Sequence, residues 1–124
     1  MQLTTSCFQF VDGWVRLLEN EDYTAAFYYT THYPSDQWTP DLMRAVVKGY
    51  GESNPAQKVT LHGKPTETWQ RKEVSCRDEP EFGAVGNVWY DLNIEGDLSD
   101  LTATFTIYKN AKGFIVVLEQ IHLM

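Results

Sequence analysis

The sequence lacks the short motifs that mark a metal site, a cofactor site or a phosphate-binding loop. Neither of the two cysteines stands in a C-x-x-C motif, and the three histidines share no ligand spacing. The eight glycines are scattered, and neither G-x-G-x-x-G nor G-x-x-x-x-G-K-[ST] occurs. We therefore expect no bound metal ion and no cofactor.

Long apolar runs and a surplus of positive charge are also missing. No apolar run approaches the roughly 20 residues that span a bilayer, so we expect no membrane segment. The N-terminus has neither a basic start nor an unbroken apolar stretch, so a secretory signal peptide is not expected. Two cysteines in a chain without an export signal are expected to be reduced thiols, which favours a cytoplasmic protein.

The charge balance limits the kind of partner. Ten basic residues stand against seventeen acidic residues, which gives a formal net charge of −7. This balance works against binding to a phosphate backbone or an anionic membrane, and it favours a basic partner. Nucleic acid is therefore not an expected ligand.

Apolar and aromatic side chains, in contrast, are plentiful. Hydrophobic residues make up 43% of the chain and aromatic residues 14%, which excludes the disordered class. A chain of 124 residues can bury a core without disulfides or a metal ion. Since no linker or repeat is visible, we expect one domain over residues 1–124.

Apolar residues at helical spacing fill roughly the first fifty residues. A first helix with Thr5 or Ser6 as its cap is predicted from Phe10, Val11, Trp14, Val15, Leu17 and Leu18. A second, short helix is predicted after Asp22, which would cap it. The third begins with Thr39 as cap and a proline at its first position, and it ends at Gly51.

Residues with strand character fill most of the remaining chain. The predicted strands cover residues 58–62, 66–76, 84–94, 101–107 and 114–123, with a solvated turn at 77–81. The last strand is apolar on both faces, so we expect it to be central in the sheet and covered on both sides. Helices followed by a meander of strands predict an α+β domain, in which N-terminal helices pack on a curved antiparallel sheet.

The last hairpin suggests one site of possible chemistry. If its loop has four residues, from Asn110 to Gly113, Leu101 pairs with His122 and Ala103 pairs with Gln120. The side chains of Gln120 and His122 would then interrupt an apolar concave face. An imidazole or a carboxylate in such a pocket is where pKa shifts and proton transfer arise.

The only plausible proton-transfer pair is Asp91 with His122. Asp91 shares a strand face with Trp89. The simpler interpretation, which we favour, is that His122 lies at a solvated strand end and that Asp91 faces water beside Asn93. We therefore lean toward a protein that is not an enzyme.

The four tryptophans are expected to differ in role. Trp14 is at helical spacing with core residues, and Trp38 is placed to form a hydrophobic staple with Met43. Trp69 and Trp89 lie on strands whose remaining face is polar. These two are the better candidates for a ligand cavity or a partner surface.

The tandem helices, the third helix behind Trp38, Thr39 and Pro40, and the strand meander together resemble the NTF2-like (cystatin-like) superfamily of cone-shaped α+β folds. The resemblance covers nearly the whole chain. Residues 88–92, residues 96–102 and the final Ile-His-Leu look like those of small bacterial proteins of no assigned activity.

The resemblance implies several functions. Ketosteroid isomerase and scytalone dehydratase, two enzymes of the superfamily, use carboxylates, histidines and tyrosines inside the cone. Their catalytic patterns do not align with this sequence, so the resemblance implies no catalytic residue. The superfamily also contains binding proteins and bacterial immunity proteins that neutralise toxins.

Our hypothesis is a non-catalytic binding domain. The pocket candidates are Trp69, Trp89, Asp91, Gln120 and His122. The ligand would be a small apolar molecule or a basic protein, and a homodimer through the sheet is possible. One alternative is an immunity-type protein that neutralises a basic toxin; another is a cofactor-free lyase or isomerase that uses Asp91 and His122. A closed polar pocket with both residues would favour the enzyme, and a filled cone with a flat acidic face would favour the protein partner.

Overall fold

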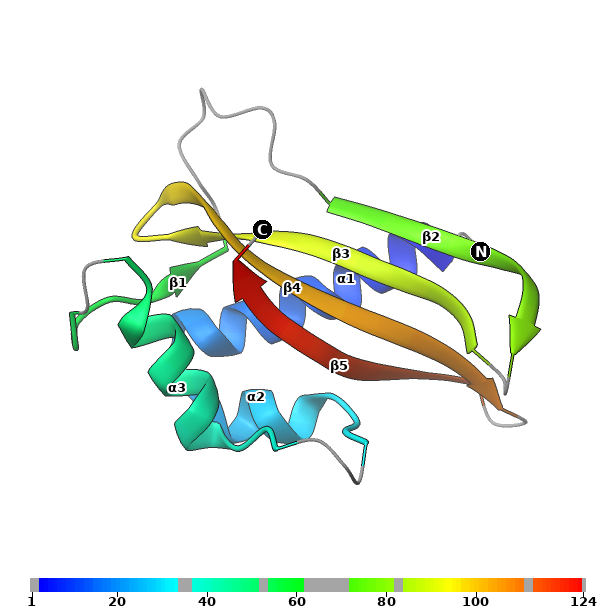
Figure 1. The fold of residues 1–124 in the computed structure, drawn as a ribbon, viewed down its shortest axis with the longest axis horizontal. Helices are drawn as coiled ribbons and strands as arrows, with labels where there is room; N and C mark the ends of the chain where they lie inside the picture. Colours follow the sequence, from blue (N-terminus) through cyan, green and yellow to red (C-terminus); the bar gives the residue numbers. More distant parts are fainter. Residues whose placement is uncertain are drawn as a thin grey trace.

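The protein has three helices packed against an open, curved antiparallel sheet, which confirms the predicted α+β class (Figure 1). The computed structural model describes residues 3–33, 37–51, 54–61, 72–81, 84–110 and 113–123. The helices are α1 (Leu3–Glu19), α2 (Tyr23–Tyr29) and α3 (Pro40–Gly49). The strands are β1 (Val59–Thr60), β2 (Lys72–Glu81), β3 (Ala84–Ile94), β4 (Asp97–Asn110) and β5 (Gly113–Leu123).

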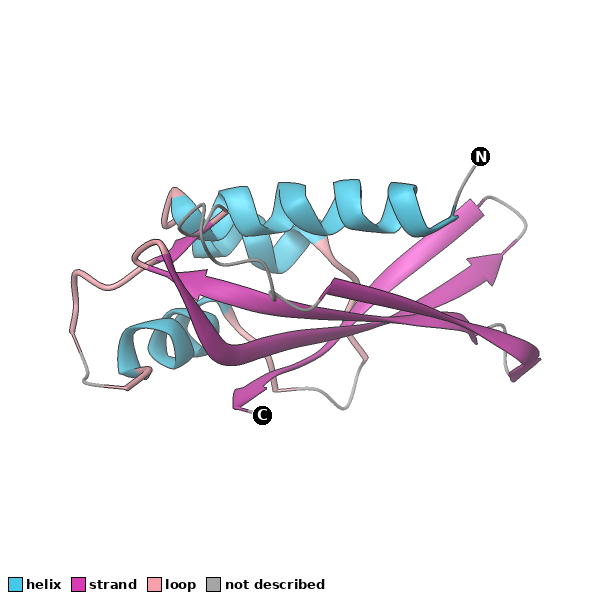
Figure 2. Ribbon diagram, turned by 90° about the horizontal axis from the view of Figure 1, so that it is seen from above, coloured by secondary structure: helices cyan, strands magenta, loops and turns pink. Residues whose placement is uncertain are grey.

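The sheet is built around β3 and β4. One edge of β3 pairs with β2 along most of its length and with β1 at its end, and the other edge pairs with β4. β5 pairs with β4 and ends the sheet. Figure 2 shows α1 lying along one face of this sheet, so the opposite face is not covered by that helix.

The predicted caps of α2 and α3 are confirmed. Asp22 accepts a hydrogen bond from the backbone N–H of Ala25 at 3.1 Å. Thr39 accepts one from the N–H of Leu42 at 3.0 Å. Gly51 follows α3 with a φ of +60°, the left-handed conformation in which a glycine ends a helix at little cost.

The predicted start of α1 is wrong. The helix begins at Leu3, so Thr5 and Ser6 lie inside it and do not cap it. The apolar stripe of α1 extends further toward the N-terminus than expected, because Cys7 is buried one turn before Val11. Burial of this extra turn favours continuation of the helix over a cap at Thr5 or Ser6.

The core lies between α1 and the covered face of the sheet. Trp14 and Phe105 are both 0% exposed, and their rings meet edge to face with centroids 5.2 Å apart. Phe105 pairs with Leu118 on the neighbouring strand, and both are fully buried, as the alternation of apolar residues predicts. These contacts fix which face of β3, β4 and β5 points toward the helices.

The expectation that the last strand is central is wrong, since β5 lies at the edge of the sheet. Its outer edge is partly covered by the chain after α2: the Thr31 N–H donates to Val116 O at 2.9 Å, and Thr31 O accepts from the Leu118 N–H at 3.2 Å. Tyr33 then reaches the second face of β5, where its hydroxyl donates to Glu119. The chain after α2 therefore shields part of β5 from solvent.

The predicted register of the last hairpin is correct near the turn and wrong beyond it. Pairing follows the prediction as far as Phe105 and Leu118, and then Glu119 is an extra residue, a β-bulge, on β5. Thr104 therefore pairs with Gln120. In the same way Thr102, and not Leu101, pairs with His122.

The bulge decides which face Gln120 and His122 occupy. Both turn away from α1, while Ile121 points into the core and is 6% exposed. A regular strand would have placed a histidine and a glutamine among apolar side chains, which costs free energy unless they are hydrogen-bonded. The bulge avoids that cost.

Two other strand predictions are changed by the structure. β2 continues through residues 77–81, the predicted turn, with an irregular pairing between Cys76 and Glu81. β4 begins at Asp97, earlier than the predicted strand over 101–107.

The predicted site residue Trp69 lies outside the described residues.

Candidate functional site

The sheet face that points away from α1 contains a groove of about 400 Å³, which we call the open-face groove. The side chains along it come from four strands: Glu73 and Ser75 of β2, Asn87 and Trp89 of β3, Thr104 and Thr106 of β4, and Glu119 of β5. Val88 and Phe105 also border the groove, but both are buried in the core. Of the side chains on the open face, all but the indole of Trp89 are polar. Its volume is in the range of small-molecule and side-chain binding sites.

Strand register places these side chains in two rows across the sheet. In one row Trp89 lies between Glu73 and Thr104, its direct partners on β2 and β4. In the other row Asn87 lies between Ser75 and Thr106. Because directly paired residues of antiparallel strands share a face, each row presents its side chains together.

The indole of Trp89 is held in place by hydrogen bonding. Its Nε1–H donates to Oδ1 of Asp91 at 3.1 Å, and the Thr102 hydroxyl donates to the same oxygen at 2.9 Å. The ring of His122 lies edge-on to the indole, with centroids 6.3 Å apart. The Asp91 carboxylate therefore fixes the orientation of the indole at one end of the groove.

The carboxylate of Glu119 lies at the β5 side of the groove, in a second hydrogen-bonded cluster. Its Oε1 accepts from the Tyr33 hydroxyl at 2.8 Å and from the Thr106 hydroxyl. Tyr33 is also hydrogen-bonded to the hydroxyl of Tyr108, and the Trp38 indole donates to the backbone oxygen of Glu119 at 3.1 Å. The bulge at Glu119 is thus tied to the chain between α2 and α3.

The pKa of the Tyr33 phenol lies well above its usual value. Burial is the largest cause, and the hydrogen bonds with Tyr108 and Glu119 raise the pKa further. The phenol consequently keeps its proton at neutral pH. Tyr33 acts there as a hydrogen-bond donor to the Glu119 carboxylate.

The structure brings four of the five pocket candidates to one face. Trp89, Asp91 and His122 are in contact through the hydrogen bond and ring packing described above, and Gln120 is exposed on the same face opposite Thr104. This face is turned away from α1, and His122 also borders a smaller groove beside α3, so the predicted concave apolar setting for Gln120 and His122 is wrong.

Asn93 also differs from its expected place. Strand alternation predicts Asn93 on the polar face of β3 with Asp91, but it is 2% exposed and its side-chain amide donates to Leu61 O at 3.3 Å. The partner is 32 residues away in the sequence, so no local pattern could indicate this bond.

The sequence reasoning missed Glu119, Thr106 and Tyr33. A carboxylate within the apolar run of β5 was the one available signal, since a charged residue in such a run requires partners. A bulge leaves no pattern of its own in a single sequence, so the partners of Glu119 could not be deduced.

The space between the helices and the sheet is filled by large side chains. Trp14, Met43, Tyr90 and Phe105 are each at most 1% exposed. The Tyr90 hydroxyl donates to Asp12 on α1 at 2.6 Å. Burial raises the pKa of Tyr90, and the hydrogen bond and charge of the Asp12 carboxylate raise it further. Within the described residues no three His, Cys, Asp or Glu side chains are grouped as metal ligands.

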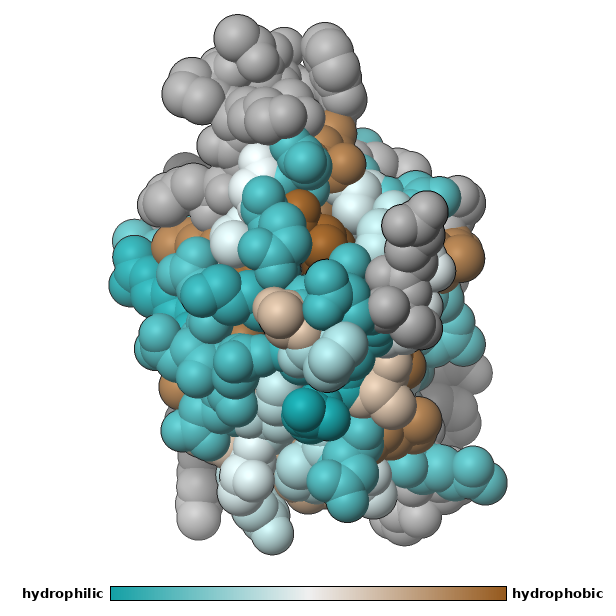
Figure 3. All heavy atoms as spheres, turned by 90° about the vertical axis from the view of Figure 1, so that its left-hand side faces the viewer, coloured by the Kyte–Doolittle hydropathy of each residue, from teal (hydrophilic) through white to brown (hydrophobic). Residues whose placement is uncertain are grey.

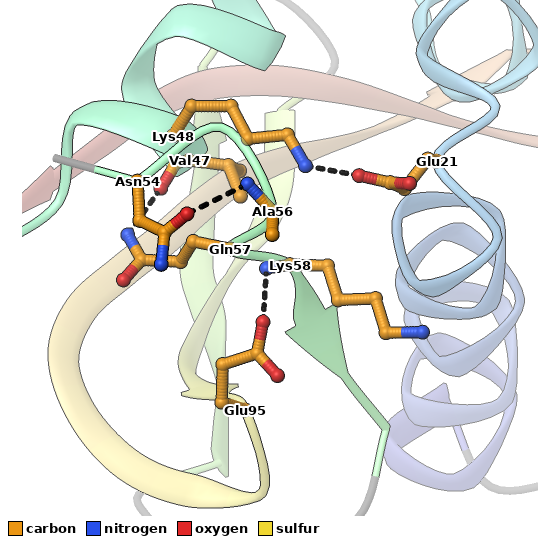
Figure 4. A network of polar contacts seen from close by, with 8 residues as sticks. All are labelled: Glu21, Val47, Lys48, Asn54, Ala56, Gln57, Lys58 and Glu95. Atoms are coloured by element: carbon orange, nitrogen blue, oxygen red, sulfur yellow. Dashed lines mark hydrogen bonds and ion pairs between the residues drawn. The ribbon is translucent and has the colours of Figure 1, made fainter.

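A second polar network joins α3 to the segment that precedes β1 (Figure 4). The Gln57 amide donates to Val47 O at 2.7 Å, which satisfies a carbonyl of the last turn of α3. Lys48 forms an ion pair with Glu21, and the hydrogen bond and charge of Lys48 lower the pKa of that carboxyl. Because its donors and acceptors are matched with each other, we assign this network a structural role.

The end of the molecule formed by α3 and the β3–β4 turn is mostly hydrophilic, with small separate apolar patches (Figure 3). Large exposed apolar patches mark sites of association, and this view shows none. None of the described helices is long and apolar enough to cross a membrane. We take the open-face groove as the candidate site, because it combines the held indole of Trp89 with polar side chains from four strands.

These features define a small α+β domain with helices on one face of an antiparallel sheet and a polar, tryptophan-containing groove on the other. Residues 15–124 match the family described as a domain of unknown function, DUF7668. Since the match covers most of the chain, the protein belongs to this family. Comparisons with curated proteins and with solved structures found no match.

Proposed function

We propose that this DUF7668 domain is a non-catalytic binding protein whose ligand occupies the open-face groove. The observation that supports this most is the position of Trp89, a half-buried indole in a groove of about 400 Å³. Asp91 fixes the ring before any ligand arrives, and such preorganisation lowers the entropy cost of binding. The filled interior supports the same proposal, because the enzymes of the NTF2-like superfamily place their catalytic residues inside the cone.

The lining of the groove favours a basic protein as the ligand over a small apolar molecule. Glu73 and Glu119 contribute carboxylates, and the chain has a net charge of −7. Opposite charge on a partner would steer it to this face and raise the association rate. An immunity-type role, in which the domain neutralises a basic toxin, is a specific case of this proposal.

The test is a chemical-shift map of isotope-labelled protein with three probes: a short oligolysine peptide, a short oligoglutamate peptide and an apolar naphthalene dye. We expect the oligolysine to shift resonances of Trp89, Asn87 and Thr106 saturably, and the shifts to weaken as salt screens the charges. Absence of shifts on this face with all three probes would overturn the proposal, as would dye binding in the interior.

One observation supports a second candidate, a cofactor-free lyase or isomerase. Asp91 and His122 lie on the same face, and Thr102 pairs directly with both. For such an enzyme, Asp91→Asn or His122→Gln would lower turnover by about 10²–10⁴-fold. Our proposal predicts no turnover in the unmodified protein across carbonyl and hydroxyl substrates, and turnover that depends on Asp91 would favour the enzyme.

We also propose that the fold is NTF2-like and that the protein is a cytoplasmic protein of bacteria. The helical layer on a curved sheet supports the first proposal. A buried thiol at Cys7 supports a reducing compartment. A homodimer through the sheet is a further proposal, since β5 is an edge strand with Phe114 and Leu123 exposed, and sedimentation equilibrium would test it.

A further inference from the structure

We propose that the open-face groove recognises a guanidinium group, presented as an arginine side chain of a basic protein partner. This inference rests on the proposed function and specifies the ligand of the same site. Three features of the groove support it: its charge, the setting of its tryptophan, and the type of its hydrogen-bonding groups.

The charge of the groove is negative on two sides. Glu73 is exposed on β2, and Glu119 is half-buried at the β5 bulge. Among the described residues, the lining of the groove includes no Lys, Arg or His. The carboxylates among the described lining residues therefore favour a cation over an anion.

Trp89 supplies a surface on which a flat cation can stack. Cations are attracted to the face of an aromatic ring, and tryptophan is the best of the aromatic side chains for this. The indole N–H donates to the Asp91 carboxylate, which polarises the ring toward greater negative charge on its face. Asp91 is thus a positioning residue that also strengthens the attraction of the ring for a cation.

Glu73 is placed to pair with a cation stacked on Trp89. The two residues are direct partners across β2 and β3, so their backbones are one strand spacing apart, about 4.8 Å. A guanidinium on the indole can therefore direct N–H groups toward the Glu73 carboxylate. Such charge-assisted bonds are stronger than those between neutral groups.

The remaining lining distinguishes a guanidinium from an ammonium. Ser75, Thr104 and Asn87 offer oxygen acceptors around the indole. A guanidinium is planar, stacks on aromatic rings and has five N–H donors, whereas an ammonium is compact and strongly hydrated. A flat ring surrounded by several acceptors thus suits arginine better than lysine.

The experiment is a titration that follows the indole N–H resonance of Trp89. The probes are a blocked Gly-Arg-Gly peptide and its lysine and citrulline counterparts; citrulline has nearly the shape of arginine but no charge. We expect saturable binding of the arginine peptide, weaker binding of the lysine peptide, and binding of the citrulline peptide at least about tenfold weaker, because cation–π attraction and charge-assisted bonds both require the charge.

Variants separate local recognition from net charge. Glu73→Gln should weaken the affinity for the arginine peptide about threefold to tenfold, since it removes a charge beside the indole. Asp41→Asn removes the same charge from the exposed first turn of α3, outside the groove, and should leave binding nearly unchanged. Asp91→Asn should shift the Trp89 indole resonance before any peptide is added and should weaken binding of the arginine peptide.

Equal affinity for the arginine and citrulline peptides would overturn the inference. Equal losses of affinity for the arginine peptide in Glu73→Gln and Asp41→Asn would also overturn it. If the oligolysine peptide shifts the open face while arginine has no preference, only this inference fails and the proposed function stands. If no probe shifts this face, the proposed function fails too.

Discussion

Phe105 is the residue on which the core packing depends most directly. It is fully buried, paired with Leu118 and in edge-to-face contact with Trp14. We predict that Phe105→Ala lowers the free energy of unfolding by about 3–5 kcal/mol in denaturant melts, because it leaves a cavity. Thr104→Ala, on the other face, is the control and should cost below about 1 kcal/mol. A comparable small loss for Phe105→Ala would contradict the packing.

Tyr90 should make the stability depend on pH in the alkaline range. Burial raises the pKa of its phenol above the ordinary value of 10.0, and the contact with Asp12 raises it further. The folded protein therefore keeps a proton that the unfolded chain releases above about pH 10. The contribution of the protonated Tyr90 phenol to the free energy of unfolding is fully present below that pH and is lost as the pH rises further.

We predict a shallower alkaline loss in Tyr90→Phe than in the unmodified protein. The measurement is the free energy of unfolding by denaturant at a series of pH values from about 8 to 11. Tyr28→Phe is the control, because Tyr28 is 76% exposed. Parallel pH profiles for the unmodified protein and Tyr90→Phe would show that the phenol is not shielded as described.

Individual core residues were predictable where the apolar period is regular. Trp14 follows helical spacing and Phe105 follows strand alternation, and both are buried. Glu119 and Asn93 were not predictable, since their partners Tyr33 and Leu61 are far away in the sequence. Local periodicity contains no information on such contacts.

Among the elements, α3 has the clearest start and end. Thr39 accepts the hydrogen bond that would otherwise be missing at Leu42 N, and Pro40 opens the helix. We predict that Thr39→Ala lowers the free energy of unfolding by about 1 kcal/mol, whereas Thr39→Ser keeps the cap and has little effect. Chemical denaturation followed by circular dichroism measures both, and an equal loss in the two variants would show that the hydroxyl is not the reason.

The strands show where pattern-based prediction of elements stops working. Alternation placed β3 and the core part of β4 correctly, because one face of each is buried against the helices. It failed for β5, where apolar residues on both faces indicated a central strand. An edge strand can be apolar on both faces when a distant segment covers part of it, as Thr31 and Tyr33 do here.

At the scale of the whole molecule, the helices and the groove divide the sheet into two faces of different use. Antiparallel sheets commonly leave one face to solvent, so a polar face alone indicates no function. What distinguishes this face is a groove with an oriented indole and two carboxylates. The sequence indicated the residues Trp89 and Asp91, but their grouping with Glu73 and Glu119 needed the strand register.

The most direct measurement is of nuclear Overhauser effects between the protein and the bound Gly-Arg-Gly peptide. We predict contacts between the indole protons of Trp89 and the methylene protons beside the guanidinium, together with contacts to Thr104. Contacts confined to the exposed apolar residues Phe114 and Leu123, or no contacts at a peptide concentration that saturates the indole shift, would contradict binding in the open-face groove.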